Sequence, residues 1–262
     1  MKLLLLLLTP LLLFSKVHYA KVEPFENITL KSAVSAQVTQ ANIRQEGTTV
    51  SGSIIKLDDK LDRTKLASSQ TSIKLIKNMI HTNQNILESL KESLNRQKAY
   101  YNRISTIASA SKTQKDNAFY GYTNAKTQYF STKEKIDSLK KQKLDLNYEV
   151  TRLRDSIAKK SIVLNNKFLY KLLVNKGDFV NMGTPLAQVK DLSSAKLVLF
   201  LEAEELKDIK KRTIYIDDKP TKYKISKIWK IADEKFISSY RTEIVIKNPK
   251  ESFSKLLKVE FK

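Results

Sequence analysis

The sequence predicts an elongated α+β protein, in which a long antiparallel α-helical coiled-coil hairpin is inserted between two halves of a small β-sandwich. Two observations lead to this prediction. Apolar residues recur every seven positions through the middle of the 262-residue chain, which is the pattern of a coiled coil. Short segments with alternating apolar residues and glycine corners stand on both sides of it. Such segments are typical of β-strands joined by tight turns.

The N-terminus carries a pattern typical of an export signal. A positively charged start precedes an apolar run from Leu3 to Phe14, and the next residues are more polar up to Ala20. This run is too short to cross a bilayer, which needs about 20 apolar residues. We therefore predict a signal peptide over residues 1–20, which is cleaved after Ala20 or kept as an N-terminal anchor.

The region from residue 59 to 160 is predicted to form the hairpin. The two series of residues at seven-residue intervals are Leu66, Ile73, Ile80, Leu87, Leu94, Tyr101 and Ala108, and Tyr122, Tyr129, Ile136, Lys143, Val150 and Ile157. Helices that carry these series would each extend about 70 Å. A serine in the segment 108–111 is suited to cap the second helix, and so short a turn forces antiparallel helices. The alternative is a homodimeric rod of long parallel helices.

Two similar segments flank the predicted hairpin, at residues 35–58 and 161–190. Each reads as short strands separated by glycine corners, and together they contain four of the five glycines: Gly47, Gly52, Gly177 and Gly183. Glycine permits the positive φ angle that tight corners require. Each segment alone has too few strands to bury a core. We therefore expect the two halves to close on each other after the hairpin returns.

Residues 191–262 are predicted to form a further unit of short strands. The strands are expected at 196–201, 213–216, 222–229, 242–246 and 257–261. Acidic residues at the start of the segment from Glu202 to Lys211 favour a short helix there. The segment 21–34 is expected to add a strand to this unit from before the sandwich halves.

The run from Gly177 to Ala187 reads Gly-Asp-x-Val-x-x-Gly-x-x-Leu-Ala and resembles the second half of a lipoyl-like domain; the run from Glu46 to Asp58 resembles the first half. The order of lipoyl-like half, hairpin, lipoyl-like half and β-barrel resembles the HlyD-like periplasmic adaptors. These are the membrane fusion proteins of efflux pumps and type I secretion systems. The resemblance covers the predicted mature chain. It implies that residues 191–262 form the β-barrel, with no membrane-proximal domain after it.

The resemblance also implies a docking site at the hairpin tip. Adaptors that dock onto an outer-membrane channel show a tyrosine, an arginine and an aliphatic residue at a spacing that Tyr101, Arg103 and Ile107 match. The second part of that motif, Ser-Lys-x-x-x-Asp-x-Ala, begins here at Ser111. The segment that joins the two parts is shorter than in the usual pattern. Arg103, Ile107 and Ser111 are the channel contacts that the resemblance implies.

The function that the resemblance implies is that of a periplasmic adaptor subunit in a tripartite efflux or secretion system. Its partners would be an inner-membrane transporter of the RND or ABC type and an outer-membrane channel protein. The chain would form a homo-oligomeric ring in the periplasm of a Gram-negative cell envelope, associated with the inner membrane. The alternative is an exported coiled-coil structural or polyanion-binding protein without a transport role.

The composition argues against an enzyme. The absence of cysteine excludes thiol nucleophiles and thiolate metal sites, and two histidines are too few for a multi-histidine centre. We therefore expect no catalytic residues, no metal and no cofactor. The net charge of +21 is typical of nucleic-acid binders, but only eight of the 48 basic residues are arginine. Because base recognition favours arginine, we expect no nucleic-acid partner.

Overall fold

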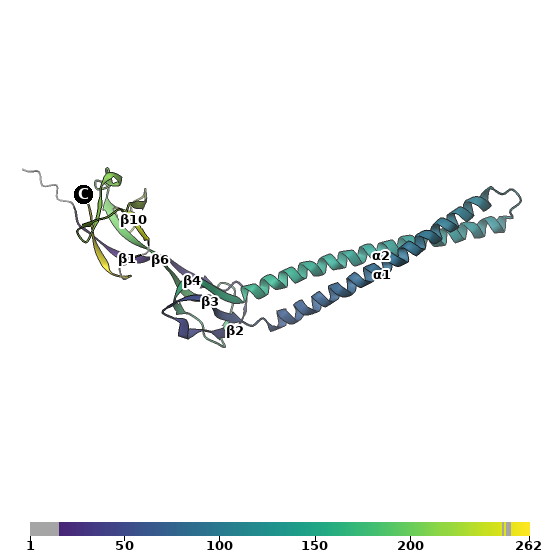
Figure 1. The fold of residues 1–262 in the computed structure, drawn as a ribbon, viewed down its shortest axis with the longest axis horizontal. Coiled ribbons are helices and arrows are strands. Elements are labelled where there is room, and N and C mark those ends of the chain that lie inside the picture. The colour runs from purple at the N-terminus through teal and green to yellow at the C-terminus, as the bar shows by residue number, and fades with distance from the viewer. Residues whose placement is uncertain (1–15, 248, 250–252) are drawn as a thin grey trace, which may run out of the picture.

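The computed structural model describes residues 16–247, 249 and 253–262. The apolar run from Leu3 to Phe14, on which the predicted export signal depends, lies outside the described residues. The chain forms a long helical hairpin that is followed, end to end, by two β-units (Figure 1). We call the unit beside the hairpin the inner β-unit and the unit at the far end the outer β-unit. The predicted elongated α+β class and the long helical hairpin are confirmed.

The hairpin consists of α1 (Lys60–Thr106) and α2 (Lys112–Lys159), which are 47 and 48 residues long. Neither helix contains proline, and Gly121 is the one glycine in them. The buried side chains of α2 follow the seven-residue pattern: Ala118, Ala125, Ile136, Leu139, Val150 and Leu153. At mid-length, Ile80 of α1 packs against Ile136 and Leu139. The seam that the sequence predicts is therefore the contact between the two helices.

One buried polar residue of the seam satisfies its amide within its own helix. Asn83 is 7% exposed, and its side-chain nitrogen donates a hydrogen bond of 2.7 Å to the Met79 carbonyl. A buried amide without a partner would cost about 1–3 kcal/mol. This bond therefore explains how α1 tolerates asparagine at a seam position.

The inner β-unit is one antiparallel arrangement built from both sequence halves. Its strands lie in the order β5, β2, β3, β4 and β6. Their bounds are Phe179–Val180, Ala36–Ala41, Thr48–Leu57, Ser161–Leu172 and Pro185–Glu202. Strand β3, before the hairpin, pairs directly with β4, after it. Ile54 and Ile55 from the first half and Leu169 and Leu186 from the second are fully buried in one core. The two halves therefore depend on each other for their core.

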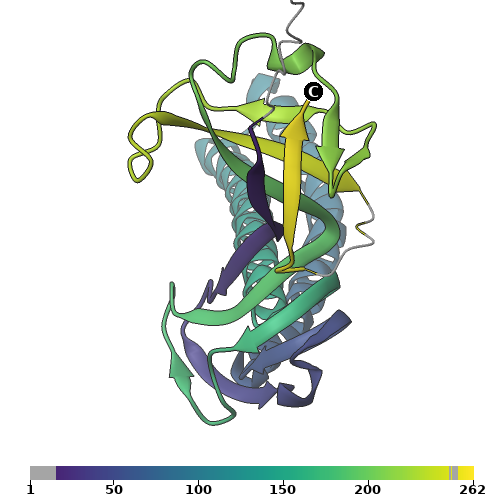
Figure 2. The ribbon, with the colours of Figure 1, turned by 90° about the vertical axis from the view of Figure 1, so that its left-hand side faces the viewer.

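The outer β-unit gathers both ends of the described chain (Figure 2). It contains parts of β1 and β6 together with five further strands. The bounds of β1, β7, β8, β9, β10 and β11 are His18–Lys31, Ile214–Ile216, Lys219–Pro220, Ile225–Ile228, Ser239–Lys247 and Leu256–Phe261. Leu197, Leu201, Ile244 and Leu257 are fully buried in its core.

Strands β1 and β6 run through both units. The segment 21–34 was expected to contribute a strand to the outer unit. In the structure β1 begins earlier, at His18, and its C-terminal part pairs with β6 in the inner unit, where Ile28 aligns with Val189. Both strands are long, at 14 and 18 residues, and each extends from one core to the other.

The expected helix from Glu202 to Lys211 is absent. Turns occupy most of this segment, and only Ile209–Lys211 forms a 3₁₀-helix. Asp208 adopts a left-handed conformation with φ of 56°, which interrupts any α-helix. The acidic side chains also have other partners, since Glu205 accepts a hydrogen bond of 2.9 Å from the Glu202 backbone and lies 2.7 Å from His18.

Candidate docking site at the hairpin tip

The tip of the hairpin is a short, closed loop between α1 and α2. Helix α1 ends at Thr106, and Ile107 leaves it with an extended backbone, at φ −78° and ψ 119°. The Ile107 N–H donates to the Ile104 carbonyl at 3.3 Å, and the Ala110 N–H donates to the Ile107 carbonyl at 3.4 Å. The turn therefore lies where the sequence predicts it, at 108–111, and the helices are antiparallel within one chain (Figure 1).

Ser111 begins α2 through a capping box. Its hydroxyl accepts the Gln114 N–H at 3.2 Å, and the Gln114 side-chain oxygen accepts the Ser111 N–H at 2.9 Å. This reciprocal arrangement satisfies two backbone donors at the helix start. Ser111 remains exposed, so its side chain both caps the helix and faces the surroundings of the tip.

Aromatic side chains brace the two helices beneath the tip. The rings of Tyr101 and Tyr122 stack at 5.8 Å between centroids with planes only 7° apart. Phe119 also contacts Tyr101, at 5.8 Å. Gly121, directly before Tyr122, faces Gln97 so closely that a Cβ would lie 2.9 Å from the Gln97 side-chain oxygen. The seven-residue pattern placed Tyr101 and Tyr122 on the seam. The contact between Phe119 and Tyr101 and the contact between Gly121 and Gln97 were not predicted.

The tip brings together the three residues that the family pattern singles out. Arg103 is exposed in the last turn of α1, with its guanidinium carbon 5.7 Å from the Tyr100 ring centroid. Ile107 is 39% exposed in the loop, and Ser111 is exposed at the start of α2. A cation, an apolar side chain and a small hydroxyl therefore lie at one end of the rod, which points away from both β-units (Figure 1).

The four predicted glycine corners lie at the other end of the rod, in the inner β-unit. All four have positive φ angles: Gly47, Gly52, Gly177 and Gly183. At Gly177 φ is 101°, and its N–H donates to the Val38 carbonyl at 2.8 Å. A Cβ there would meet nothing within 4 Å, so the backbone conformation, rather than space, accounts for glycine. These residues shape the inner unit and take no part in the tip.

Several carboxylates in the described residues form ion pairs. Those with a shifted pKa all have it lowered: Asp62, Glu149, Asp191, Glu205 and Glu260. The clearest case is Glu149, where hydrogen bonds from Arg152 and Lys65 lower the pKa to about 2. A general acid at neutral pH needs the opposite, a raised pKa. Among the described residues, no three His, Cys, Asp or Glu side chains are grouped so as to hold a metal ion.

None of the described helices is long and apolar enough to cross a membrane. Both long helices belong to the hairpin, and each carries many charged side chains.

Comparisons by sequence find no matching family model and no matching curated protein. Comparison by structure finds clear similarities over almost the whole chain. The crystal structure of MacA from Actinobacillus actinomycetemcomitans aligns over 95% of this chain and 78% of MacA, with a TM-score of 0.71 at 14% identity. The membrane fusion protein Spr0693 from Streptococcus pneumoniae R6 aligns over 95% of this chain and 99% of its own, with a TM-score of 0.55 at 9% identity.

A third similarity is to a chimeric protein. A MacA–MexA chimeric protein, which contains the Pseudomonas aeruginosa MexA α-hairpin domain, aligns over 95% of this chain and 81% of the chimera. Its TM-score is 0.53 at 16% identity. The fold of almost the whole chain is thus found in solved structures of this kind. The chain has the fold of the membrane fusion proteins, the family of periplasmic adaptors that its sequence resembles.

Proposed function

We propose that this chain is the periplasmic adaptor subunit of a tripartite efflux or secretion system. It would bridge an inner-membrane transporter of the RND or ABC type and an outer-membrane channel protein. The observation that supports this most is the exposed set of Arg103, Ile107 and Ser111 at the tip of a hairpin. The tip lies at one end of the molecule and the outer β-unit lies at the other.

The length of the hairpin suits this role. A helix of 47 residues extends about 70 Å, so the tip lies far from both β-units. The capping box at Ser111 and the stacked rings of Tyr101 and Tyr122 hold the tip in one shape. A preorganised contact loses less entropy on binding than a flexible one. The hairpin therefore suits a protein that must carry a recognition site across a gap.

The chemistry of the tip suits recognition of another protein's backbone and carboxylates. The guanidinium of Arg103 has fixed donor directions, which match carboxylates in pairs. Ser111 adds a small donor and acceptor, and Ile107 adds an apolar knob to fill a cavity in the partner. In this proposal the outer β-unit faces the inner-membrane transporter, and several copies assemble as a ring in the periplasm of a Gram-negative cell.

The decisive experiment compares Arg103→Asp with Arg96→Asp. Both arginines are on α1, and the Arg96 side chain is 84% exposed with only a 3.7 Å contact to Glu92. We expect Arg103→Asp to abolish export and co-purification with the channel, while Arg96→Asp retains both. Circular dichroism should show the same helix content in both variants. Full transport and unchanged channel binding by Arg103→Asp would show that the tip does not dock through this residue.

A further inference from the structure

The loop between β9 and β10, residues 229–238, presents apolar side chains to the surroundings. Ile237 is 86% exposed and Ile231 is 82% exposed, which makes them the two most exposed large apolar side chains in the part of the chain that the structure describes. Phe236, in the same loop, is 44% exposed. The loop projects from the outer β-unit (Figure 2). Apolar side chains that are exposed together, as in this loop, are typical of surfaces that contact a partner or a membrane.

Internal bonds hold this loop in shape. The Asp233 carboxylate accepts the backbone N–H groups of Lys235 and Phe236, at 2.9 and 3.2 Å. The Asp233 N–H donates to the Ser239 carbonyl at 2.9 Å, and the Ser239 N–H donates to the Phe236 carbonyl at 2.8 Å. The Phe236 ring lies 4.3 Å from the Phe200 ring on β6. The two isoleucines are therefore presented by an ordered loop.

The chain that leads into the loop is strongly basic. Between residues 219 and 232 there are five lysines and no acidic residue: Lys219, Lys222, Lys224, Lys227 and Lys230. All five are exposed. Two cations lie over the Trp229 ring: Lys227 Nζ is 4.2 Å and Arg241 Cζ is 5.0 Å from the ring centroid. The acidic groups of the loop are Asp233, which is engaged with the backbone, and the exposed Glu234.

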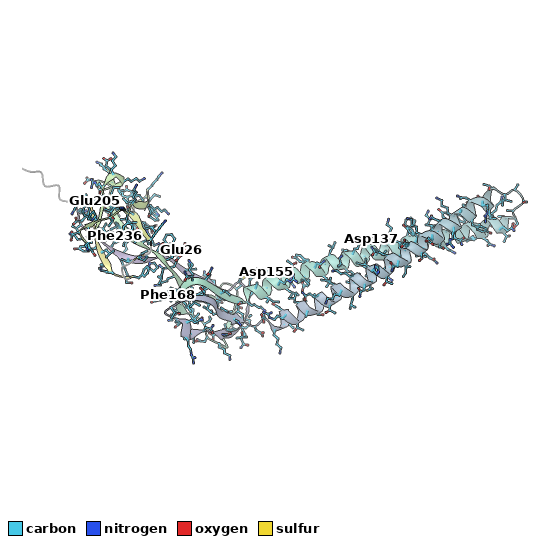
Figure 3. All side chains as sticks on the ribbon, viewed as in Figure 1. Glu26, Asp137, Asp155, Phe168, Glu205 and Phe236 are labelled. Atoms are coloured by element: carbon cyan, nitrogen blue, oxygen red, sulfur yellow. The ribbon has the colours of Figure 1, made fainter. Side chains whose placement is uncertain are left out.

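The loop lies beside the point where the described chain begins. Ser239, directly after the loop, pairs with Glu202 at the end of β6. The Glu202 carboxylate in turn lies 2.9 Å from the Lys16 ammonium. In the sequence Lys16 almost directly follows the apolar run from Leu3 to Phe14. Figure 3 places Phe236 and Glu205 together in the outer β-unit, at the end of the molecule farthest from the hairpin tip.

We propose that the 229–238 loop is a peripheral membrane contact that binds the surface of an anionic phospholipid bilayer. Ile231 and Ile237 would insert between the acyl chains, Trp229 would lie at the interface, and the five lysines would approach the headgroup phosphates. Tryptophan prefers this depth, and clustered lysines bind anionic lipid surfaces. This inference goes beyond the proposed adaptor function and does not depend on it.

A lipid surface fits the loop better than a protein partner does. Protein interfaces are depleted in lysine, whereas five lysines lead into this loop. Long lysine side chains can keep their ammonium groups in the headgroup region while their stems lie along apolar surface. The two isoleucines stand on a projecting loop, which can insert into a soft, fluid layer without a matching cavity.

Trp229 makes the experiment specific, because it is the only tryptophan of the chain. The full chain is mixed with vesicles of phosphatidylcholine that contain or lack phosphatidylglycerol. We expect the Trp229 emission to shift to shorter wavelength with the anionic vesicles, and to be quenched by lipids brominated in the acyl chains. High salt should weaken the effect, because it screens exposed charges. The isoleucine variants separate this contact from an N-terminal segment that binds vesicles by itself, because they leave that segment unchanged.

Matched variants test the two isoleucines. We expect Ile231→Ser with Ile237→Ser to weaken vesicle binding by roughly tenfold or more, since two apolar side chains no longer insert. Leu61→Ser is the control, because Leu61 is 79% exposed at the start of α1, in the hairpin. It should leave the emission shift unchanged.

Three results would overturn the proposal. The first is an unchanged Trp229 spectrum with phosphatidylglycerol vesicles, whether or not the protein sediments with them. The second is equal binding to neutral vesicles, which would remove the role of the lysines. The third is a double variant that binds vesicles normally. If that variant also no longer co-purified with a transporter, the loop would be a protein contact. If Arg103→Asp kept full transport and channel binding, the vesicle measurements on Trp229 and the isoleucine variants would still test the membrane contact.

Discussion

Ser156, near the end of α2, donates a hydrogen bond of 2.8 Å from its hydroxyl to the carboxylate of Asp62, in the first turn of α1. Lys160 Nζ lies 3.0 Å from the same carboxylate oxygen. The base of the hairpin is therefore closed at the point where both helices meet the inner β-unit. Although burial acts to raise the pKa of Asp62, the hydrogen bonds from Ser156 and Lys160 hold it below its ordinary value.

Asp62→Asn is expected to loosen the hairpin base. The neutral amide keeps the shape of the carboxylate but loses the ion pair with Lys160, at a cost of about 1 kcal/mol. Hydrogen exchange of the amides at the ends of α1 and α2 should become faster. Asp155→Asn is the control, because Asp155 is 60% exposed and pairs with Lys159 on its own helix. Equal protection in both variants would show that the Asp62 contact does not hold the base closed.

The same contact predicts a pH dependence at the hairpin base. The pKa of Asp62 is lower in the folded chain than its ordinary value. The stabilisation is therefore complete above about pH 4, the ordinary pKa of aspartate, and is lost as the pH falls through the lower folded value. Protection of the base amides should fall in this acidic range in the wild type, and this step should be missing in Asp62→Asn.

Leu139→Asp is expected to unfold the middle of the rod. Leu139 is 5% exposed and packs with Ile80 and Ile136. Truncation of a buried leucine costs about 2–5 kcal/mol, and a buried carboxylate adds to that cost. Circular dichroism at 222 nm should show a loss of helix, with the β-units retained. Leu144→Asp, at a residue that is 65% exposed on the same helix, should melt like the wild type.

Leu169→Ala is expected to destabilise both halves of the inner β-unit together. Leu169 is fully buried on β4, and its strand pairs with β3 from before the hairpin. We expect a loss of about 2–5 kcal/mol in the free energy of unfolding. Limited proteolysis should then cut within residues 35–58 as well as 161–190. Leu173→Ala is the control, because it changes the same residue type at a site that is 39% exposed. It should cost less stability than Leu169→Ala. If Leu169→Ala left residues 35–58 protected, the halves would be independent.

A chain that begins at Lys21 is expected to be less stable than one that begins at Lys16. Ala20 is 1% exposed, and His18 and Ala20 pair with Val259 and Leu257 of β11. Loss of residues 16–20 removes this pairing and part of the outer core. Thermal unfolding should therefore occur at a lower temperature for the shorter chain. Cleavage after Ala20, as predicted from the sequence, would remove these residues. Mass spectrometry of the exported protein would show whether that cleavage occurs. Equal melting temperatures would show that this end of β1 contributes little.

Local patterns were sufficient to predict much of the fold. The seven-residue repeats predicted α1 and α2, because a helix places residues seven apart on one face. The serine-containing segment 108–111 marked the turn, and the capping box at Ser111 is its local cause. The glycine corners were also predicted from the sequence, because their positive φ angles are a property of single residues.

Other features depend on residues that are far apart in the chain. The sequence predicted Arg103, Ile107 and Ser111 as site residues only through a family spacing. The tertiary structure decided that β1 and β6 cross both β-units, because strand pairing depends on which edge is free after folding. It likewise decided that Glu202 and Glu205 contact Lys16 and His18 instead of starting a helix.

By itself, then, the sequence of this protein determined its helices, its turn and its glycine corners, each of which depends on residues within a few turns of one another. Only the tertiary structure decided that Asp62 meets Ser156 and that Ile231 and Ile237 stay exposed in the loop before β10. Apolar alternation does not distinguish a buried isoleucine from an exposed one until the strands are paired. Burial is a property of the assembled sheet, because each side chain is covered by neighbours that arrive from distant parts of the chain.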